Sequence, residues 1–128
     1  YHRYFAHKSY KTSRVFQFII AFMAQTSAQK GALWWAAHHR DHHRHSDTPH
    51  DVHSPREGFW WAHVGWILST DHDDYDAARV ADFGRYPELR WLDRHHWVPL
   101  AGYGAYAATA QQADPDRPRP GQKLDVSI

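Results

Sequence analysis

The segment from His38 to His45, HHRDHHRH, contains five of the thirteen histidines within eight residues. Neutral imidazole is a good ligand for iron, zinc, copper and nickel, and spacings of three and four along a helix bring side chains together. The chain has no cysteine, so thiolate zinc sites and iron–sulfur clusters are excluded. Any metal must therefore be bound by imidazole or carboxylate, and the segment predicts a metal site made of histidines.

Two faces of this helix are alternative ligand sets. With His39 as the reference direction, His42 lies at about −60° and His43 at about +40°, so these three share one face. His38, His42 and His45 share a second and narrower face of the same helix. Helical periodicity does not decide between the two. The competing interpretation is a solvated polar helix that binds no metal.

A second histidine pair lies at the start of the chain, in HRYFAH. On a helix, five residues advance by about 500°, so His2 and His7 would point roughly 140° apart and could not chelate from one face. They could instead flank a shared site or bind two metals, and the alternative is a pair of surface histidines. His53 and His63 stand alone and are expected to be structural or to support ligands rather than to bind metal.

The elements that position these histidines are predicted to be helices. Residues 15–23 are mostly apolar, and residues 33–45 contain neither glycine nor proline, so each segment is predicted to be a helix. Pro49 should end the second one, because the residue before a proline avoids the helical region. Two shorter helices are expected on either side of Pro87. The other polar residues of the histidine-rich helix, Arg40, Asp41 and Arg44, are expected to face solvent or form ion pairs.

Composition limits the class of protein. Lys plus Arg is 15 and Asp plus Glu is 14, so the formal charge of +1 gives no reason to expect a nucleic-acid partner. The longest apolar run, residues 15–24, is too short for a spanning helix, which needs about 20 apolar residues. Many aromatic residues combined with a mean hydropathy of −0.78 suit a membrane–water boundary or an aromatic-walled pocket. The predicted fold class is all-α.

Together these features resemble the membrane fatty acid desaturases, and among them the bacterial acyl-CoA (stearoyl-CoA type) delta-9 desaturases. HRYFAH matches the first histidine box of that family, HRDHH the second, and SDTPHDVHSPREGFWWAHVGW the run that follows. PELRWLDRHHWVP resembles the segment just before the third membrane helix. We therefore assign residues 1–99 to a desaturase domain fragment, the cytosolic helical cap with boxes one and two. Residues 100–128 are assigned to a divergent tail that is expected to be disordered, most clearly from about Ala113.

The resemblance implies a non-haem di-iron site and names its ligands in this chain. It favours the face of His39 over the face of His38. Trp35 and Gln29 match family positions that line the acyl tunnel near the irons and would therefore bind substrate. The implied metal ligands, which come from the two histidine boxes, are His2, His7, His39, His42 and His43.

The implied activity is that of an O₂-dependent acyl-CoA desaturase, which introduces a cis double bond into a fatty acyl chain. The cofactors would be two non-haem iron ions, because an unactivated C–H bond requires redox chemistry. The substrate would be a fatty acyl thioester, with acyl-CoA favoured, and electrons would come from a cytochrome b5- or ferredoxin-type partner. The parent enzyme would be an integral membrane protein, with this segment on the cytoplasmic face.

The sequence also departs from the family pattern. The third histidine box, which would be a second H-x-x-H-H after HRDHH, is absent, so we expect the chain to be a fragment that is inactive when isolated. One alternative function is a fatty acyl or alkane hydroxylase of the same superfamily. Another is a non-catalytic histidine-rich module that binds metal.

Overall fold

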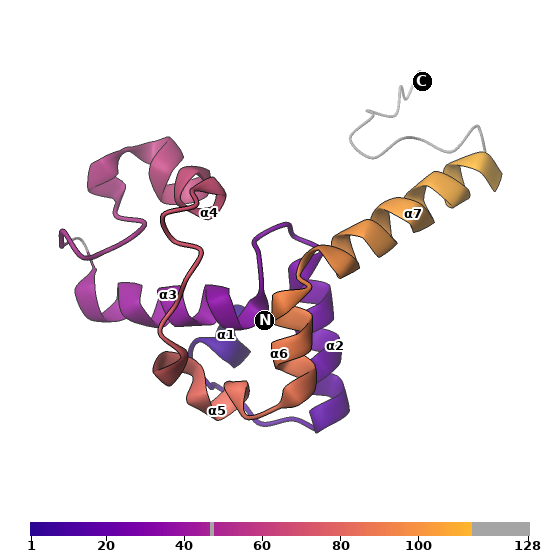
Figure 1. Cartoon of the computed structure of the whole chain (residues 1–128), viewed down its shortest axis with the longest axis horizontal. Coiled ribbons are helices and arrows are strands. Elements are labelled where there is room, and N and C mark those ends of the chain that lie inside the picture. Colours follow the sequence, from indigo (N-terminus) through magenta and orange to yellow (C-terminus); the bar gives the residue numbers. More distant parts are fainter. Residues whose placement is uncertain (47, 114–128) are drawn as a thin grey trace, which may run out of the picture.

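The computed structural model describes residues 1–46 and 48–113, and every regular element within them is helical (Figure 1). This confirms the all-α prediction. The longer helices are α2 (Arg14–Gln25), α3 (Ala32–His45), α6 (Pro87–Arg94) and α7 (Trp97–Ala113). The short helix α1 (His2–Phe5) precedes them. Five more short elements lie between α3 and α6: η1 (Pro55–Glu57), η2 (Trp61–Gly65), α4 (Trp66–Leu68), η3 (Ala77–Val80) and α5 (Ala81–Gly84).

The helix starts follow from local chemistry. The Ser13 side chain accepts a hydrogen bond from the Phe16 N–H at 3.2 Å, which caps α2. Pro87 occupies the first turn of α6, where its missing N–H costs nothing. Helices α2, α3 and α6 therefore form where apolar periodicity and proline placement predict them.

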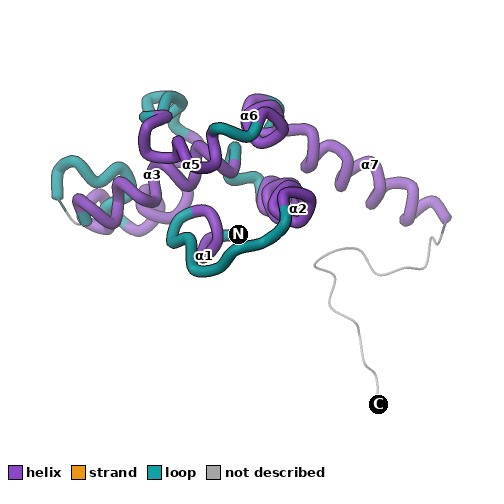
Figure 2. Tube along the Cα trace, turned by 90° about the horizontal axis from the view of Figure 1, so that it is seen from below, coloured by secondary structure: helices purple, strands orange, loops and turns teal. Residues whose placement is uncertain are grey.

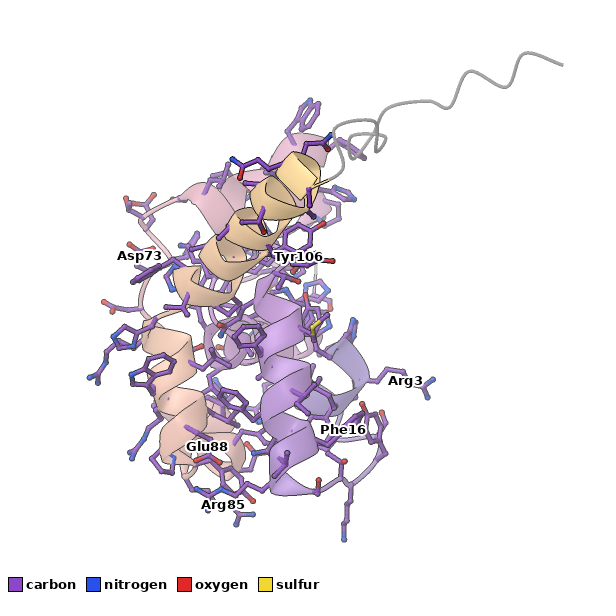
Figure 3. The ribbon with its side chains drawn as sticks, turned by 90° about the vertical axis from the view of Figure 1, so that its right-hand side faces the viewer. Arg3, Phe16, Asp73, Arg85, Glu88 and Tyr106 are labelled. Carbon is purple, nitrogen blue, oxygen red and sulfur yellow. The ribbon has the colours of Figure 1, made fainter. Side chains whose placement is uncertain are left out.

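The apolar core lies where α1, α2, α3, η3 and α6 meet, and Figure 2 shows α1 below the gap between α3 and α2. Helices α2 and α6 run side by side in Figure 3, where Phe16 and Glu88 are labelled. Arg14 of α2 donates to Glu88 of α6 at 2.7 Å, so an ion pair joins them at the edge of the core. The largest fully buried apolar side chains are Phe5, Leu33, Val80, Leu89, Leu92 and Pro99.

The start of α3 depends on a residue of α6. Gly31, at the N-cap of α3, has no side chain to cap the helix. Asp93, a residue of α6, caps it instead. Its Oδ1 accepts from the Leu33 N–H at 2.8 Å and from the Trp34 N–H at 3.0 Å, while Tyr75 donates to Oδ2 at 2.9 Å. A Cβ at position 31 would lie 1.9 Å from Oδ1, so this approach is open only to glycine.

Helix α7 projects away from the rest of the chain (Figure 1). It includes residues 100–113, so the prediction of disorder is wrong for this part of the tail. Alanine favours helix even without apolar periodicity. Several of its aromatic side chains are exposed, among them Trp97, Tyr103 and Tyr106. The expectation of disorder beyond Ala113 falls outside the described residues. Among the residues described, no helix combines the length and the apolar character needed to cross a membrane.

Gly31→Ala is predicted to destabilise the fold, because the new methyl group would displace the Asp93 carboxylate from two N–H groups. The free energy of unfolding, measured by urea denaturation, should fall by about 1–3 kcal/mol. Gly84→Ala is the matched control, because no atom lies within 4 Å of the added Cβ there. Equal stability of the two variants would contradict the capping role of Asp93.

Candidate metal centre

Four histidines converge between α1 and α3. The Nε2 atoms of His2 and His7 are 2.7 Å apart, those of His2 and His39 are 3.1 Å apart, and those of His39 and His43 are 3.0 Å apart. One ligand nitrogen from each ring lies within 4.8 Å of all the others. We call these four residues the four-histidine group.

The geometry of the first pair differs from the helical expectation. Helix α1 ends at Phe5, and the chain then turns through Lys8, which has a φ of 52°. Because His7 is no longer on the helix, the predicted separation of roughly 140° is wrong. The His2 and His7 rings instead stack with centroids 4.8 Å apart and an interplanar angle of 16°. The expectation that the pair flanks a shared site agrees with this arrangement.

Arg40 of α3 fastens this turn to the second histidine segment. Its guanidinium donates to the carbonyl oxygens of Phe5 and Ala6, the two residues just before His7. The same group pairs with Asp82 at 2.9 Å. Arg40 was expected to face solvent or form an ion pair; the ion pair is present, but the side chain is largely buried and also binds backbone.

Asp82 receives a second cation from the same turn. Lys8 contacts its carboxylate at 2.8 Å. Burial would raise the pKa of Asp82, but the hydrogen bonds from Arg40 and Lys8 outweigh burial and lower it. The carboxylate therefore stays ionised and holds the His7 turn from its other side.

The two faces of α3 have different surroundings. His39 and His43 point to the first pair, whereas the buried His38 ring packs against Trp34, with centroids 4.6 Å apart. The His45 ring lies near His50, with centroids 6.0 Å apart. The structure thus places His39 and His43, from one predicted face, beside the His2–His7 pair. It places His38 and His45, from the other predicted face, away from that pair.

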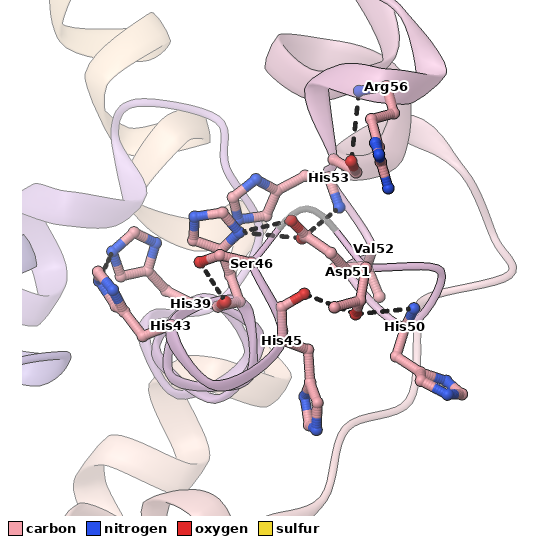
Figure 4. Close-up of polar contacts among 12 residues, drawn as sticks. His39, His43, His45, Ser46, His50, Asp51, Val52, His53 and Arg56 are labelled. Carbon is pink, nitrogen blue, oxygen red and sulfur yellow. Dashed lines mark hydrogen bonds and ion pairs between the residues drawn. The ribbon is translucent and has the colours of Figure 1, made fainter.

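A second group of possible ligands adjoins the first. His42, Asp51 and His53 have ligand atoms within 4.8 Å of one another, and we call them the Asp51 group. The His42 ring centroid is 5.8 Å from that of His39 and 5.6 Å from that of His43. Figure 4 shows Asp51 and His53 in the loop beside the helix that carries His39 and His43. The two groups are therefore neighbours along α3.

Sequence reasoning missed Asp51 and gave His53 only a supporting role. The carboxylate of Asp51 is buried, and both of its oxygens lie 2.9 Å from His42 Nδ1. The only signal in the sequence was an acidic residue among histidines in a loop. That signal is too general to single out Asp51, because acidic loop residues are usually solvated.

The two candidate substrate-binding residues border the four-histidine group. The Trp35 ring stacks on His39 with centroids 4.5 Å apart and also meets the Tyr1 ring at 4.9 Å. The Tyr1 hydroxyl donates to Gln29 Oε1 at 2.7 Å. Trp35 therefore forms an aromatic wall beside the imidazoles, with Gln29 linked to it through Tyr1.

The surroundings of His2, His39 and His43 favour the neutral form of their imidazoles. Burial, reinforced by the neighbouring rings of His2 and His43, lowers the pKa of His39 to about 3. Burial and nearby histidines also lower the pKa of His2, His43 and His53. A neutral ring keeps the lone pair that a metal requires.

The donor atoms fit a transition-metal ion. The Nε2 atoms of His2 and His39 each face two other nitrogens, and one N–H per ring cannot serve two such contacts well. Nitrogen ligands at about 2.0–2.1 Å from a common metal lie about 3 Å apart, close to the spacings found here. An all-imidazole set suits iron, zinc, copper or nickel.

The sequence around both groups resembles that of known enzymes. The chain is 41% identical over 105 residues to the acyl-CoA Delta(11) desaturase of Choristoneura rosaceana, covering 79% of this chain and 31% of that protein. It is 36% identical over 100 residues to the sn-2 palmitoyl-lipid 9-desaturase of Nostoc sp. (strain 36), covering 74% and 35%. The chain is a relative of the acyl desaturases. Acyl-CoA desaturase 1 of Saccharomyces cerevisiae is also similar, at 34% identity over 97 residues, covering 75% and 19%.

The desaturase resemblance is thereby confirmed at the level of the family. The chain spans about a fifth to a third of the length of these relatives. Their names include both acyl-CoA and acyl-lipid desaturases, so they do not select the bacterial stearoyl-CoA type. No protein-family model and no solved structure matches the chain.

Arg40→Ala is predicted to release the His7 turn from α3. It removes one of the two cations that bind Asp82 and leaves the carbonyl oxygens of Phe5 and Ala6 without the Arg40 donor, so the free energy of unfolding should fall by about 2–4 kcal/mol. Urea denaturation measures this change. Arg85→Ala is the control, because that exposed side chain donates only to Tyr86 within the described residues, and it should cost about 0.5 kcal/mol or less. A loss no larger for Arg40→Ala would disprove the anchoring role.

The lowered pKa of His39 predicts acid sensitivity. The unfolded chain binds a proton at His39 below about pH 6.5, whereas the folded chain does so only near pH 3, so stability falls as the pH drops through this window. Between pH 7 and pH 5 this residue should contribute a loss of about 1 kcal/mol, after discounting for its partial exposure. His39→Gln should flatten the pH dependence of unfolding. An unchanged slope in His39→Gln would refute the assignment.

Proposed function

We propose that this chain is part of a non-haem di-iron acyl desaturase, which uses O₂ and electrons to introduce a cis double bond into a fatty acyl chain. The observation that supports this most directly is the convergence of His2 and His7 on His39 and His43 from a separate segment. The similarity to named desaturases gives that convergence its chemical context. The finer proposal is a bacterial delta-9 enzyme of the stearoyl-CoA type.

The proposed ligands of the two iron ions are His2, His7, His39, His42 and His43. Bound iron would supply the redox chemistry that removal of hydrogen from an unactivated methylene requires. The chain itself provides these imidazoles and holds the two histidine segments together through the Arg40 contact. Because the sequence lacks the third histidine box, the 128-residue chain alone is expected to bind iron without turnover.

Trp35 and Gln29 are the proposed acyl-binding residues. An indole ring stacked on His39 offers an apolar surface against which methylene groups can lie. Gln29, held by the Tyr1 hydroxyl, places an amide at the edge of the same surface. Together the two side chains would position the acyl chain beside the imidazoles and exclude water from it.

The proposed substrate is a fatty acyl thioester, with acyl-CoA favoured, alongside O₂. A cytochrome b5- or ferredoxin-type protein would donate electrons. The parent enzyme would lie in a membrane, with this segment on the cytoplasmic face. Exposed apolar side chains on α2, including Val15, Phe16 and Met23, suit a neighbouring lipid or apolar protein surface.

Anaerobic titration of the chain with ferrous iron tests the ligand set. His39→Ala, which removes the ring at the centre of the four-histidine group, should weaken binding at least ~10-fold. His45→Ala is the matched control, because it removes an imidazole from the same helix but outside both groups. Equal iron affinity of the two variants would refute the proposed centre.

The reaction is tested in a chimera in which this chain replaces the matching segment of the yeast acyl-CoA desaturase. Mass analysis of the acyl products should show the loss of two hydrogens, and His39→Ala should abolish it. A gain of one oxygen would instead support the hydroxylase. Iron binding by the chain, combined with no O₂-dependent product from the chimera, would support the non-catalytic histidine-rich module.

A further inference from the structure

Asp51 binds two parts of the site at once. Both carboxylate oxygens lie 2.9 Å from Nδ1 of His42, in the last turn of α3. Oδ1 also accepts a hydrogen bond from the backbone N–H of His53 at 3.2 Å. The Asp51 side chain has no solvent-exposed surface, so water does not compete for these contacts. A buried carboxylate thus ties the loop after α3 to one imidazole of the helix.

This contact selects one tautomer of His42. An ionised carboxylate can only accept hydrogen bonds, so the Nδ1 atom of His42 must be the donor. Whenever the ring is neutral, its single proton is then on Nδ1 and its lone pair is on Nε2. Metal-binding histidines commonly donate their other ring N–H to a carboxylate, which fixes both tautomer and ring orientation.

The His42 ring is also held on one face. The His53 ring stacks on it with centroids 4.0 Å apart, and Trp66 lies 5.0 Å from His53. Trp61 Nε1 donates to the Val52 carbonyl at 3.1 Å, which anchors the loop between Asp51 and His53. The loop therefore has little freedom to release the imidazole.

We infer that Asp51 is a positioning residue of the metal centre, which holds His42 with its Nε2 lone pair available to a metal. The His42 ring lies beside His39 and His43. If His42 were turned away, its Nε2 atom could not bind the same metal centre as those two rings. This inference rests on the proposed function, because it gives Asp51 a role toward the same metal centre. It adds a residue that the histidine boxes do not contain.

The test uses ¹⁵N-histidine NMR of the metal-free chain and Co²⁺ titration followed by absorption. In the unaltered chain, His42 should have its proton on Nδ1. In Asp51→Asn, the amide oxygen keeps the His53 N–H and the amide NH₂ faces His42, so the proton should move to Nε2. The Co²⁺ dissociation constant should then rise 10- to 100-fold.

Asp41→Asn is the matched control, because it removes the same charge next to His42, from a carboxylate that pairs with Arg79 at 2.8 Å. It should leave the His42 tautomer unchanged and alter the Co²⁺ affinity less than about threefold. A purely structural role for Asp51 would not move the tautomer, so the NMR arm separates positioning from loss of fold.

Two results would overturn the inference: an Nε2-bound proton on His42 in the unaltered chain, or equal Co²⁺ affinity of Asp51→Asn and the unaltered chain. The first needs no variant, so it decides the question even if Asp51→Asn fails to fold. Absence of Co²⁺ binding by the unaltered chain would instead overturn the proposed metal centre itself, and with it the role of Asp51 toward a metal.

Discussion

The guanidinium of Arg40 is the contact on which the rest of the site depends. It binds the carbonyl oxygens of Phe5 and Ala6 and the carboxylate of Asp82, so three segments far apart in sequence meet at one side chain. Helix α1 is a single turn, which has no independent stability in water. Its position against α3 must therefore come from tertiary contacts, and His2 in the helix and His7 in the turn after it are aligned only while those contacts hold.

Polar groups from other segments also fix the two ends of α3. Asp93 of α6 caps its first turn, and Asp51 holds the imidazole in its last turn. Between them, apolar packing buries one side of the helix while the histidines lie on another. Apolar packing tolerates small rotations, whereas hydrogen bonds at both ends do not, so the direction of the metal-facing side is set chiefly by charged and polar contacts.

Much of this arrangement can be predicted from the sequence. The rest cannot, and the reasons are physical. Apolar periodicity and prolines predict α2, α3 and α6, and helical spacing places His39 and His43 on one face. The approach of His2 to His7 is not predictable in this way, because it requires α1 to stop and Lys8 to take a positive φ. The roles of Arg40 and Asp51 depend on partners distant in sequence or in a loop, and α7 lacks the periodicity that marks a helix.

The four-histidine group has a consequence for the folding of the chain. An ion shared by His7 and His39 would cross-link two points roughly 30 residues apart, which restricts the unfolded chain in the manner of a disulfide. Binding free energy would then also be folding free energy, because no such cluster exists in an unfolded chain. Release of the ion would empty the site and would also loosen the first turn of the chain from α3. One event would therefore change both the chemistry and the local order of this end of the protein.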